Sequence, residues 1–257
     1  MRPPLIVAVA CAALFCRPAA AEVIAVAAAD AALPTMTLYW PATQPRALLV
    51  YIPGGDGHIG LRAGQTDMAN PFYLMLKQLT DSPNSRQDLD VVLFDSPERL
   101  ASIQARAGRD HLSRIGAVLQ FYRQKTGKPV WLMGHSNGAL SVTEYVRYAI
   151  KLGQAHPVDG LIVSAPNKAT FFDSTPLDFP VLFMLHSKDS CIGSDTSAAA
   201  ASFRKVQGLD NARTAFTYID SGSAEGKLPC ASGYHMYNGA APEVTGVLRD
   251  FIAPTAR

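Results

Sequence analysis

After residue 21 the sequence has no apolar run long enough to cross a membrane. It also lacks the Gly-Lys-Ser/Thr ending of a P-loop, which disfavours a nucleoside triphosphate site. The histidines are scattered, and no two side chains have the spacing of metal ligands. We find no internal repeat or low-complexity tract there either. These absences disfavour membrane-spanning, metal-dependent and repeat proteins, and we expect no cofactor.

The first 21 residues have the pattern of a secretory signal peptide. Arg2 gives a positive start, residues 5–15 form an apolar core, and residues 19–21 supply small side chains for cleavage. We therefore expect export to the periplasm or beyond the cell. Residues 22–257 are long enough for one domain with a substantial core.

Charge gives no sign of a nucleic-acid partner. The full chain has 23 Lys and Arg against 21 Asp and Glu. The predicted signal peptide contains Arg2 and Arg17 and no acidic residue, so the remaining chain is formally neutral. A nucleic-acid-binding domain would need a basic footprint. We expect a monomer that acts on a small molecule.

Only two cysteines, Cys191 and Cys230, lie beyond the predicted signal peptide. An exported protein enters an oxidising compartment, so we expect them to form a disulfide. Two free buried thiols are the alternative.

Short apolar runs alternate with helix-like stretches along the chain, which predicts an α/β fold with a mostly parallel sheet covered by helices on both faces. About seven strands are expected, at residues 35–40, 46–52, 89–94, 130–133, 160–163, 181–185 and 214–219. Helices are expected at residues 71–79, 109–125, 137–152, 197–206 and 244–252. Ligands of such sheets bind at the carboxyl ends of the strands.

The segment Gly134-His135-Ser136-Asn137-Gly138 lies between a predicted strand and a predicted helix. This G-x-S-x-G pattern in that context is typical of a nucleophile elbow, in which the serine sits on a strained turn with an exposed hydroxyl. An ordinary glycine-rich turn is the alternative.

A serine nucleophile needs a base, and the base needs an orienting acid. His235 follows the last predicted strand, and we expect it to be the base. His156 and His186 are the other histidines after Ser136, and His156 is expected at the opposite end of the sheet. Asp189 follows the strand at 181–185 and is the expected acid. Other acid candidates are Asp195 and, with weaker placement, Asp173 and Asp178.

A glycine-rich loop at residues 53–57 follows an early strand and is placed to help stabilise an oxyanion. We expect one backbone N–H donor from Asn137 and a second from Gly55 or Asp56, which the sequence does not separate. His58 could contact substrate or be a solvated loop residue.

Together, the loop at 53–57, the elbow at 134–138, Asp189 and His235 resemble the α/β-hydrolase family. The likeness spans essentially the chain after residue 21, and it is greatest to small exported bacterial members. It implies an eight-stranded, mainly parallel sheet and a Ser-His-Asp triad. The family's substrates include esters, amides, lactones and haloalkanes, and Ser136 argues against the dehalogenases, which use a carboxylate.

About 17 residues separate the strand ending near Val163 from the strand beginning at Val181, which is short for a large lid. Phe171 and Phe172 lie in that connection and could wall an acyl pocket, although they could equally be core. We therefore expect a carboxylesterase for small or soluble esters. The alternatives are an amidase, peptidase or acyltransferase with the same triad, or a catalytically silent binding module.

Overall fold

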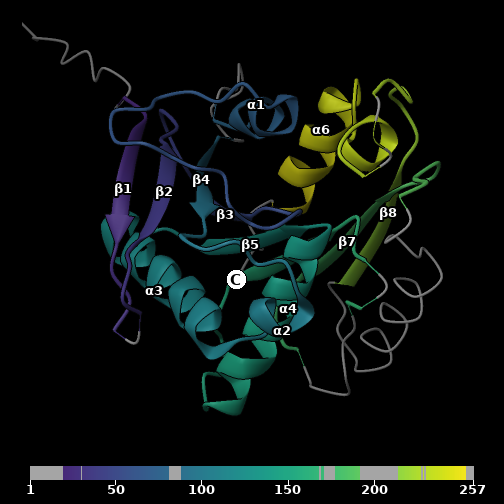
Figure 1. Ribbon diagram of the computed structural model, residues 1–257. Coiled ribbons are helices and arrows are strands. Elements are labelled where there is room, and N and C mark those ends of the chain that lie inside the picture. The colour runs from purple at the N-terminus through teal and green to yellow at the C-terminus, as the bar shows by residue number, and fades with distance from the viewer. Residues whose placement is uncertain are drawn as a thin grey trace, which may run out of the picture.

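The computed structural model describes residues 20–29, 31–80, 88–167, 169–170, 177–191, 214–226, 228 and 230–252. Its centre is an eight-stranded sheet between two layers of helices (Figure 1). The strands are β1 (Glu22–Val26), β2 (Thr35–Trp40), β3 (Ala47–Ile52), β4 (Leu89–Asp95), β5 (Val130–His135), β6 (Gly160–Ser164), β7 (Val181–His186) and β8 (Thr214–Ile219).

The strand order is β1-β2-β4-β3-β5-β6-β7-β8. Strands β3 to β8 are parallel, whereas β2 runs antiparallel to both of its neighbours. The predicted mostly parallel sheet is therefore confirmed. The sequence analysis did not identify β1, because this five-residue strand lies beside alanine-rich sequence that blurs its ends.

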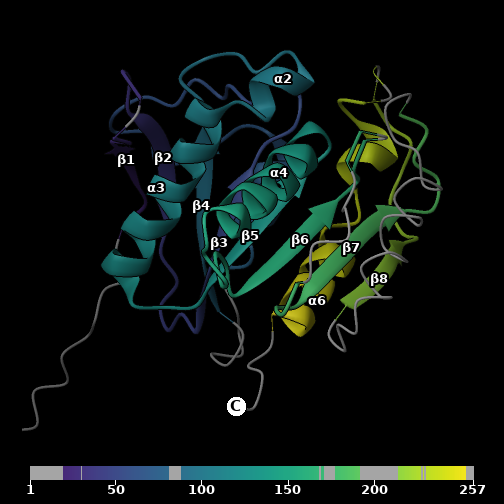
Figure 2. The ribbon, with the colours of Figure 1, turned by 90° about the horizontal axis from the view of Figure 1, so that it is seen from below.

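Helices α3 (Arg109–Thr126) and α4 (Asn137–Lys151) cover one face of the sheet, and α1 (Pro71–Lys77) and α6 (Ala241–Phe251) cover the other (Figures 1 and 2). Between β4 and α3 there is also a four-residue helix, α2 (Ile103–Arg106). No helix among the described residues is both long and apolar enough to span a membrane.

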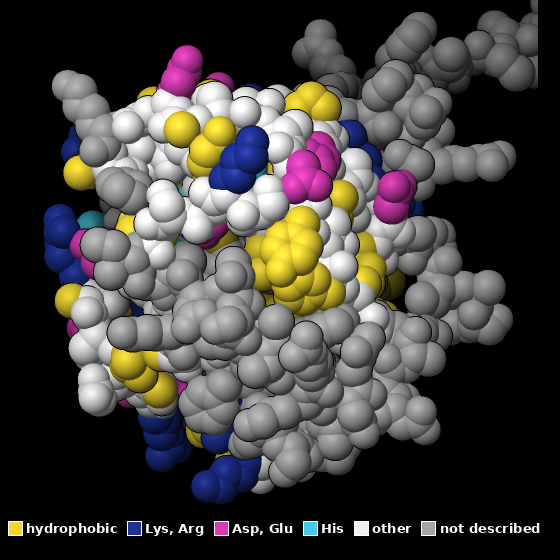
Figure 3. All heavy atoms as spheres, turned by 90° about the vertical axis from the view of Figure 1, so that its right-hand side faces the viewer, with side chains coloured by type: hydrophobic (Ala, Val, Ile, Leu, Met, Phe, Trp, Pro, Cys, Tyr) yellow, Lys and Arg dark blue, Asp and Glu magenta, His cyan; other side chains and the backbone are white. Residues whose placement is uncertain are grey.

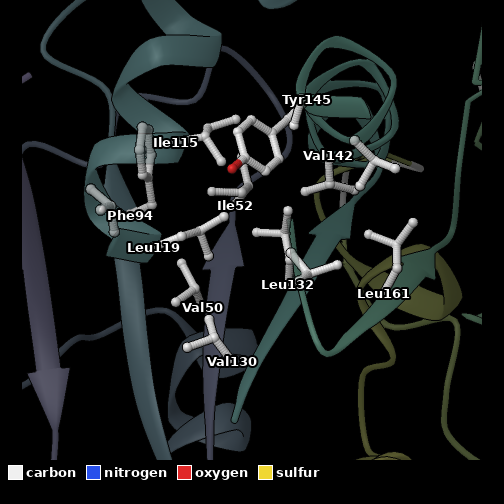
Figure 4. Close-up of a cluster of buried hydrophobic side chains, with 14 of the residues drawn as sticks. Val50, Ile52, Phe94, Ile115, Leu119, Val130, Leu132, Val142, Tyr145 and Leu161 are labelled. Atoms are coloured by element: carbon white, nitrogen blue, oxygen red, sulfur yellow. The ribbon is translucent and has the colours of Figure 1, made fainter. Parts of the chain in front are cut away.

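The central strands are buried on both faces, as their continuous apolar sequences predict. In β3, Leu48, Val50 and Ile52 face the α3–α4 layer, while Leu49 and Tyr51 face the α1–α6 layer. Figure 4 shows the first of these clusters, where Val50 and Ile52 lie among side chains of β5, α3 and α4. This two-sided burial fixes the carboxyl ends of β3 and β5 relative to each other.

Most predicted helices are confirmed with small shifts at their ends. Helix α3 ends at Thr126 and is capped by Gly127, which adopts a left-handed conformation with φ 65°. Helix α1 is two residues shorter than predicted, and Asn70 caps it by accepting a hydrogen bond from the Phe72 N–H. The helix expected at residues 197–206 lies outside the described residues.

Strand β8 is the outermost parallel strand and is less buried than its neighbours. It bears an aromatic pair, Phe216 and Tyr218, whose ring centroids are 4.8 Å apart. Figure 3 shows this side of the molecule, with a group of hydrophobic side chains exposed at its surface. The ring of Tyr218 is among the exposed hydrophobic groups.

Candidate active site

Ser136 occupies the sharp turn between β5 and α4. Its backbone angles are φ 55° and ψ −122°, a conformation that costs a non-glycine residue on the order of 1–3 kcal/mol. A Cβ atom added at Gly134 would lie 2.2 Å from the Gly138 carbonyl oxygen, and one at Gly138 would lie 2.2 Å from the Ile52 carbonyl oxygen. Only glycine fits at these two positions. The predicted strand–turn–helix context of the G-x-S-x-G segment is confirmed.

Asp189 and His235 lie together after β7 and β8, as predicted. The Nδ1 atom of His235 is 2.8 Å from Oδ2 of Asp189, and the two side chains are 1% and 0% exposed. A carboxylate can only accept, so Nδ1–H donates and Nε2 is the basic nitrogen of the ring. His235 belongs to a short 3₁₀ helix, η2 (Gly233–Met236), between β8 and α6.

A disulfide joins the chain segments that carry this pair. Cys191 and Cys230 are bonded with a Cα–Cα distance of 4.6 Å, which confirms the predicted bridge. The backbone N–H of Cys191 also donates to Oδ1 of Asp189 at 2.9 Å. The bridge therefore begins two residues after the acid and ends five residues before His235.

His135, the residue before Ser136, connects the elbow to the His235 segment. Its ring centroid is 5.1 Å from that of His235 and 4.6 Å from that of Phe72. Burial, with a smaller contribution from the charge of His235, holds the pKa of His135 well below its usual value, so its ring is neutral. His235 is thus packed against the immediate neighbour of Ser136.

A hydrogen-bond chain that the sequence analysis did not foresee supports His135. The Tyr237 hydroxyl donates to the Met184 carbonyl at 3.0 Å. Because its one proton is used there, Tyr237 accepts from the Ser164 hydroxyl at 3.0 Å. Ser164 in turn accepts from His135 Nδ1–H at 3.0 Å. All of these groups are buried. Tyr237 follows η2 directly, so the chain links β5, β6 and β7 to the segment that carries His235.

The glycine-rich loop after β3 packs against the elbow. A Cβ added at Gly54 would lie 2.9 Å from Cβ of Ser136. Gly57 N–H donates to the Gly54 carbonyl at 3.0 Å, and Gly55 has φ 56°, so residues 54–57 form a tight turn that needs glycine at its second position. Gly54, the residue before the predicted donors Gly55 and Asp56, therefore packs directly against Ser136, and the donor role of those two residues stays a prediction.

Side chains from other elements also hold this loop, and the sequence analysis overlooked them. The Nδ2 atom of Asn137 donates to the Gly55 carbonyl at 2.9 Å, and Asn137 Oδ1 accepts from Asn167 Nδ2 at 2.6 Å. Arg106, at the end of α2, donates to several carbonyls of the loop. Neither role has a sequence signature, because both depend on contacts across the fold.

The segment Gly55-Asp56-Gly57-His58-Ile59-Gly60 has G-x-G-x-x-G spacing after a strand. A dinucleotide site also needs a helix that starts at these glycines and points its N-terminus at the pyrophosphate. In the described segment from Pro53 to Asn70 no helix begins, and α1 starts only at Pro71. The spacing therefore does not make a dinucleotide site in this fold.

His58 and Asp56 form contacts within the loop region. Nδ1 of His58 lies 2.7 Å from the Ser96 carbonyl oxygen, and the side chain is 35% exposed. Asp56 accepts from Arg99 at 2.7 Å through Oδ2 and from the His58 backbone N–H through Oδ1. His58 is partly exposed and directly follows the glycine-rich loop, so substrate contact stays a prediction.

The other histidines and acids considered from the sequence have different places. His156 precedes β6 and lies 3.3 Å from Asp178, which precedes β7, so this exposed pair is at the opposite end of the sheet from Ser136, as expected. His186 is buried, accepts from the Lys188 N–H and donates to the Ser221 carbonyl. Four further candidates lie outside the described residues: Asp173, Asp195, Phe171 and Phe172. Within the described part of the chain, no cluster of side chains could hold a metal ion.

No protein-family model matches this sequence, and a comparison with curated proteins finds no relative.

Solved structures do resemble it. XC6422 from Xanthomonas campestris, described as an a/b serine hydrolase without lid, is 15% identical with a TM-score of 0.60, over 94% of this chain and 99% of that one. An alpha-beta serine hydrolase homologue from Coxiella burnetii is 15% identical with a TM-score of 0.60, over 90% and 97%. Brefeldin A esterase, described as a bacterial homologue of human hormone sensitive lipase, is 15% identical with a TM-score of 0.61, over 91% and 76%. The chain therefore has the α/β-hydrolase fold.

Proposed function

We propose that this protein is an exported serine hydrolase, and specifically a carboxylesterase for small or soluble esters. The observation that carries the proposal is the buried hydrogen bond between His235 and Asp189. The ring of His235 packs against that of His135, the residue before the strained elbow at Ser136. Such a pair serves catalysis when it keeps one imidazole nitrogen basic and aimed at a nucleophile. The likeness to serine hydrolases and esterases supports the same reaction class.

In the proposed mechanism the Ser136 hydroxyl oxygen attacks the ester carbonyl carbon while His235 Nε2 takes the hydroxyl proton. The carbonyl π electrons move to the oxygen, which becomes an oxyanion. When the tetrahedral intermediate collapses, the C–O bond to the alcohol breaks and His235 returns the proton to the leaving alkoxide. Water then hydrolyses the acyl-enzyme by the same proton transfers in reverse.

Asp189 would orient the imidazole and stabilise the imidazolium that forms transiently. The oxyanion would accept hydrogen bonds from the N–H of Asn137, at the start of α4, and from that of Gly55 or Asp56. The 15-residue helix α4 adds the positive end of its dipole at the same place. Each donor of this kind contributes roughly 2.7–4 kcal/mol in the transition state.

The preference for small esters rests on the short connection between β6 and β7, which leaves little chain for a large lid. Its residues 171–176 lie outside the described part, so a pocket wall from Phe171 and Phe172 stays a prediction. The signal peptide and the periplasmic or extracellular location also stay predictions. The Cys191–Cys230 bridge is consistent with an oxidising compartment.

The test is labelling with a fluorophosphonate probe, which phosphonylates an activated serine. We expect rapid labelling of the native protein, none of Ser136→Ala, and native labelling of Ser113→Ala, a control on α3 away from the elbow. Hydrolysis of p-nitrophenyl esters of increasing acyl length, compared with matched anilides, then separates an esterase from an amidase. Equal labelling of the native and Ser136→Ala proteins would exclude the proposal, as would labelling of neither.

A further inference from the structure

Arg106 is a buried arginine that the proposed mechanism has not used. It ends α2 and is 1% exposed. Its guanidinium lies behind the glycine-rich loop and donates to three successive carbonyls, those of Pro53 at 3.3 Å, Gly54 at 3.3 Å and Gly55 at 3.0 Å. A fourth hydrogen bond, at 2.8 Å, goes to the hydroxyl of Ser141 on α4.

The charge of this guanidinium has no direct counterion in the described part of the protein, where its hydrogen-bond acceptors are carbonyls and a hydroxyl. The nearby acid Asp56 is instead paired with Arg99. Burial lowers the pKa of Arg106 to about 10, although nearby Tyr51 and Asp56 act in the other direction. The group therefore remains a cation at neutral pH. A buried charge without a counterion is costly and calls for a functional explanation.

The direction of the three carbonyls determines where the loop's N–H groups point. No described peptide bond is cis, and in a planar trans peptide the C=O and the following N–H point in opposite directions. Because the Gly54 and Gly55 carbonyls turn toward Arg106, the N–H groups of Gly55 and Asp56 turn away from it. These two N–H groups are the oxyanion donors expected beside Ser136, against which Gly54 packs.

We propose that Arg106 is a positioning residue for the oxyanion hole: it holds the Gly54–Asp56 peptides with their N–H groups toward the reacting carbonyl, and its charge supports the oxyanion from behind the loop. The inference rests on the proposed function. Arginine suits this role because its planar fork presents five fixed donors, whereas the single ammonium of lysine cannot hold three carbonyls in one arrangement.

A purely structural arginine would affect stability without favouring the transition state. The test therefore compares three quantities: kcat and KM for a p-nitrophenyl ester, the affinity for a boronic acid that mimics the tetrahedral anion, and the melting temperature. The variants are Arg106→Lys and Arg106→Gln. The matched control is Arg114→Lys, because Arg114 is also a buried arginine bonded to a carbonyl, that of Leu33, but on α3 away from the loop.

Loss of one oxyanion donor lowers kcat by about 10²–10³. We expect misdirected donors to cost less, so Arg106→Gln should lower kcat about 10- to 100-fold and Arg106→Lys about 10-fold. KM should change less than about twofold, and boronic acid affinity should fall with kcat. Arg114→Lys should lower the melting temperature while keeping kcat and the boronic acid affinity.

Ser141→Ala gives a second route if an Arg106 variant fails to fold, because it removes one anchor of the guanidinium and leaves the loop's own sequence intact. It should lower kcat and boronic acid affinity together by a few-fold. The inference is overturned if the folded Arg106 variants, or Ser141→Ala in their place, keep native kcat and boronic acid affinity. In that case fluorophosphonate labelling of Ser136 in the native protein would still stand, so failure of this inference is separate from failure of the proposed function.

Discussion

Asp189 and His235 are 46 residues apart in the sequence, yet they share a 2.8 Å hydrogen bond that is almost fully closed to solvent. Asp189 lies three residues after the end of β7, and His235 lies in the connection that follows the neighbouring parallel strand β8. Because parallel strands end at one edge of the sheet, the connections after β7 and β8 begin side by side, and the hydrogen bonds of Tyr237 to Met184 and Ser164 hold the His235 segment there. The disulfide then limits their relative movement.

Replacing Asp189 by Asn should leave the fold intact and abolish most of the esterase activity. The amide cannot hold the imidazole in the same tautomer, so we expect kcat to fall about 10⁴-fold with a small change in KM. Asp178→Asn is the matched control, because Asp178 pairs with His156 at the other end of the sheet. Steady-state kinetics of both variants checks this, and a loss smaller than about tenfold in Asp189→Asn would contradict the role of the acid.

Breaking the disulfide should impair the acid–base pair before it unfolds the protein. The bridge closes a loop of 39 residues, which corresponds to about 3–4 kcal/mol in the chain-entropy model. We expect the Cys191→Ser/Cys230→Ser variant to lose a larger fraction of kcat than of its far-ultraviolet circular dichroism. Addition of reductant to the native protein should have the same effect, and unchanged activity after verified reduction would show that the bridge does not support the site.

Alanine at Gly138 should displace the elbow, because its Cβ would lie 2.2 Å from the Ile52 carbonyl oxygen. We expect a loss of activity and a lower free energy of unfolding. Gly246→Ala is the opposite case: within α6, the added Cβ would meet no atom within 4 Å beyond its chain neighbours and the helix's own backbone, and alanine should stabilise the helix by about 0.5–1 kcal/mol. Urea unfolding measures both changes, and equal effects of the two variants would refute this account of the elbow.

Stability should decline in mild acid because of His111. This side chain is 3% exposed, and burial, together with the charges of Arg106 and Arg114, lowers its pKa to about 3. In the unfolded chain its pKa is about 6.5. The unfolded state therefore binds more protons between these values, and the free energy of unfolding should fall by about 1.4 kcal/mol per pH unit as the pH drops below about 6.5.

In urea unfolding measured from pH 7 to pH 4, His111→Leu should reduce the fall in the free energy of unfolding with decreasing pH. Buried His135, whose pKa is also lowered, should leave a second dependence of the same sign. The matched control is His156→Gln, since His156 is exposed and paired only at the surface. If the free energy of unfolding of His111→Leu depends on pH as steeply as that of the native protein, His111 is not the cause of the acid destabilisation.

The strands of the sheet, and the polar loops that follow them, could be predicted because strands buried on both faces, such as β3, have continuous apolar sequences. The places of Ser136, Asp189 and His235 followed from where those runs end. Helix α2 was missed because four residues are too few to show helical periodicity. Arg106 was missed for a related reason: an arginine in a short connection has the same local sequence whether it is solvated or buried.

Contacts between distant segments were likewise beyond sequence reasoning. The bond from Asn137 to the Gly55 carbonyl spans 82 positions, and that between Ser164 and Tyr237 spans 73. Neither pair has a composition or spacing that distinguishes it from other polar residues. By contrast, the bridge between Cys191 and Cys230 could be predicted because no other cysteine remained after residue 21.

The strand order divides the proposed active site between an inner and an outer part of the protein. Ser136 and the Gly54–Gly57 turn follow β5 and β3, which have sheet neighbours on both sides, whereas His235 follows β8, a strand at the edge of the sheet. Unfolding from that edge that reached β7, to which the Cys191–Cys230 bridge and the Tyr237–Met184 hydrogen bond tie the His235 segment, would withdraw the imidazole and leave Ser136 in its turn. The protein would then remain folded, but Ser136 would lack its base. The half-life of activity on heating should therefore depend on unfolding of the peripheral strands and not of the central ones.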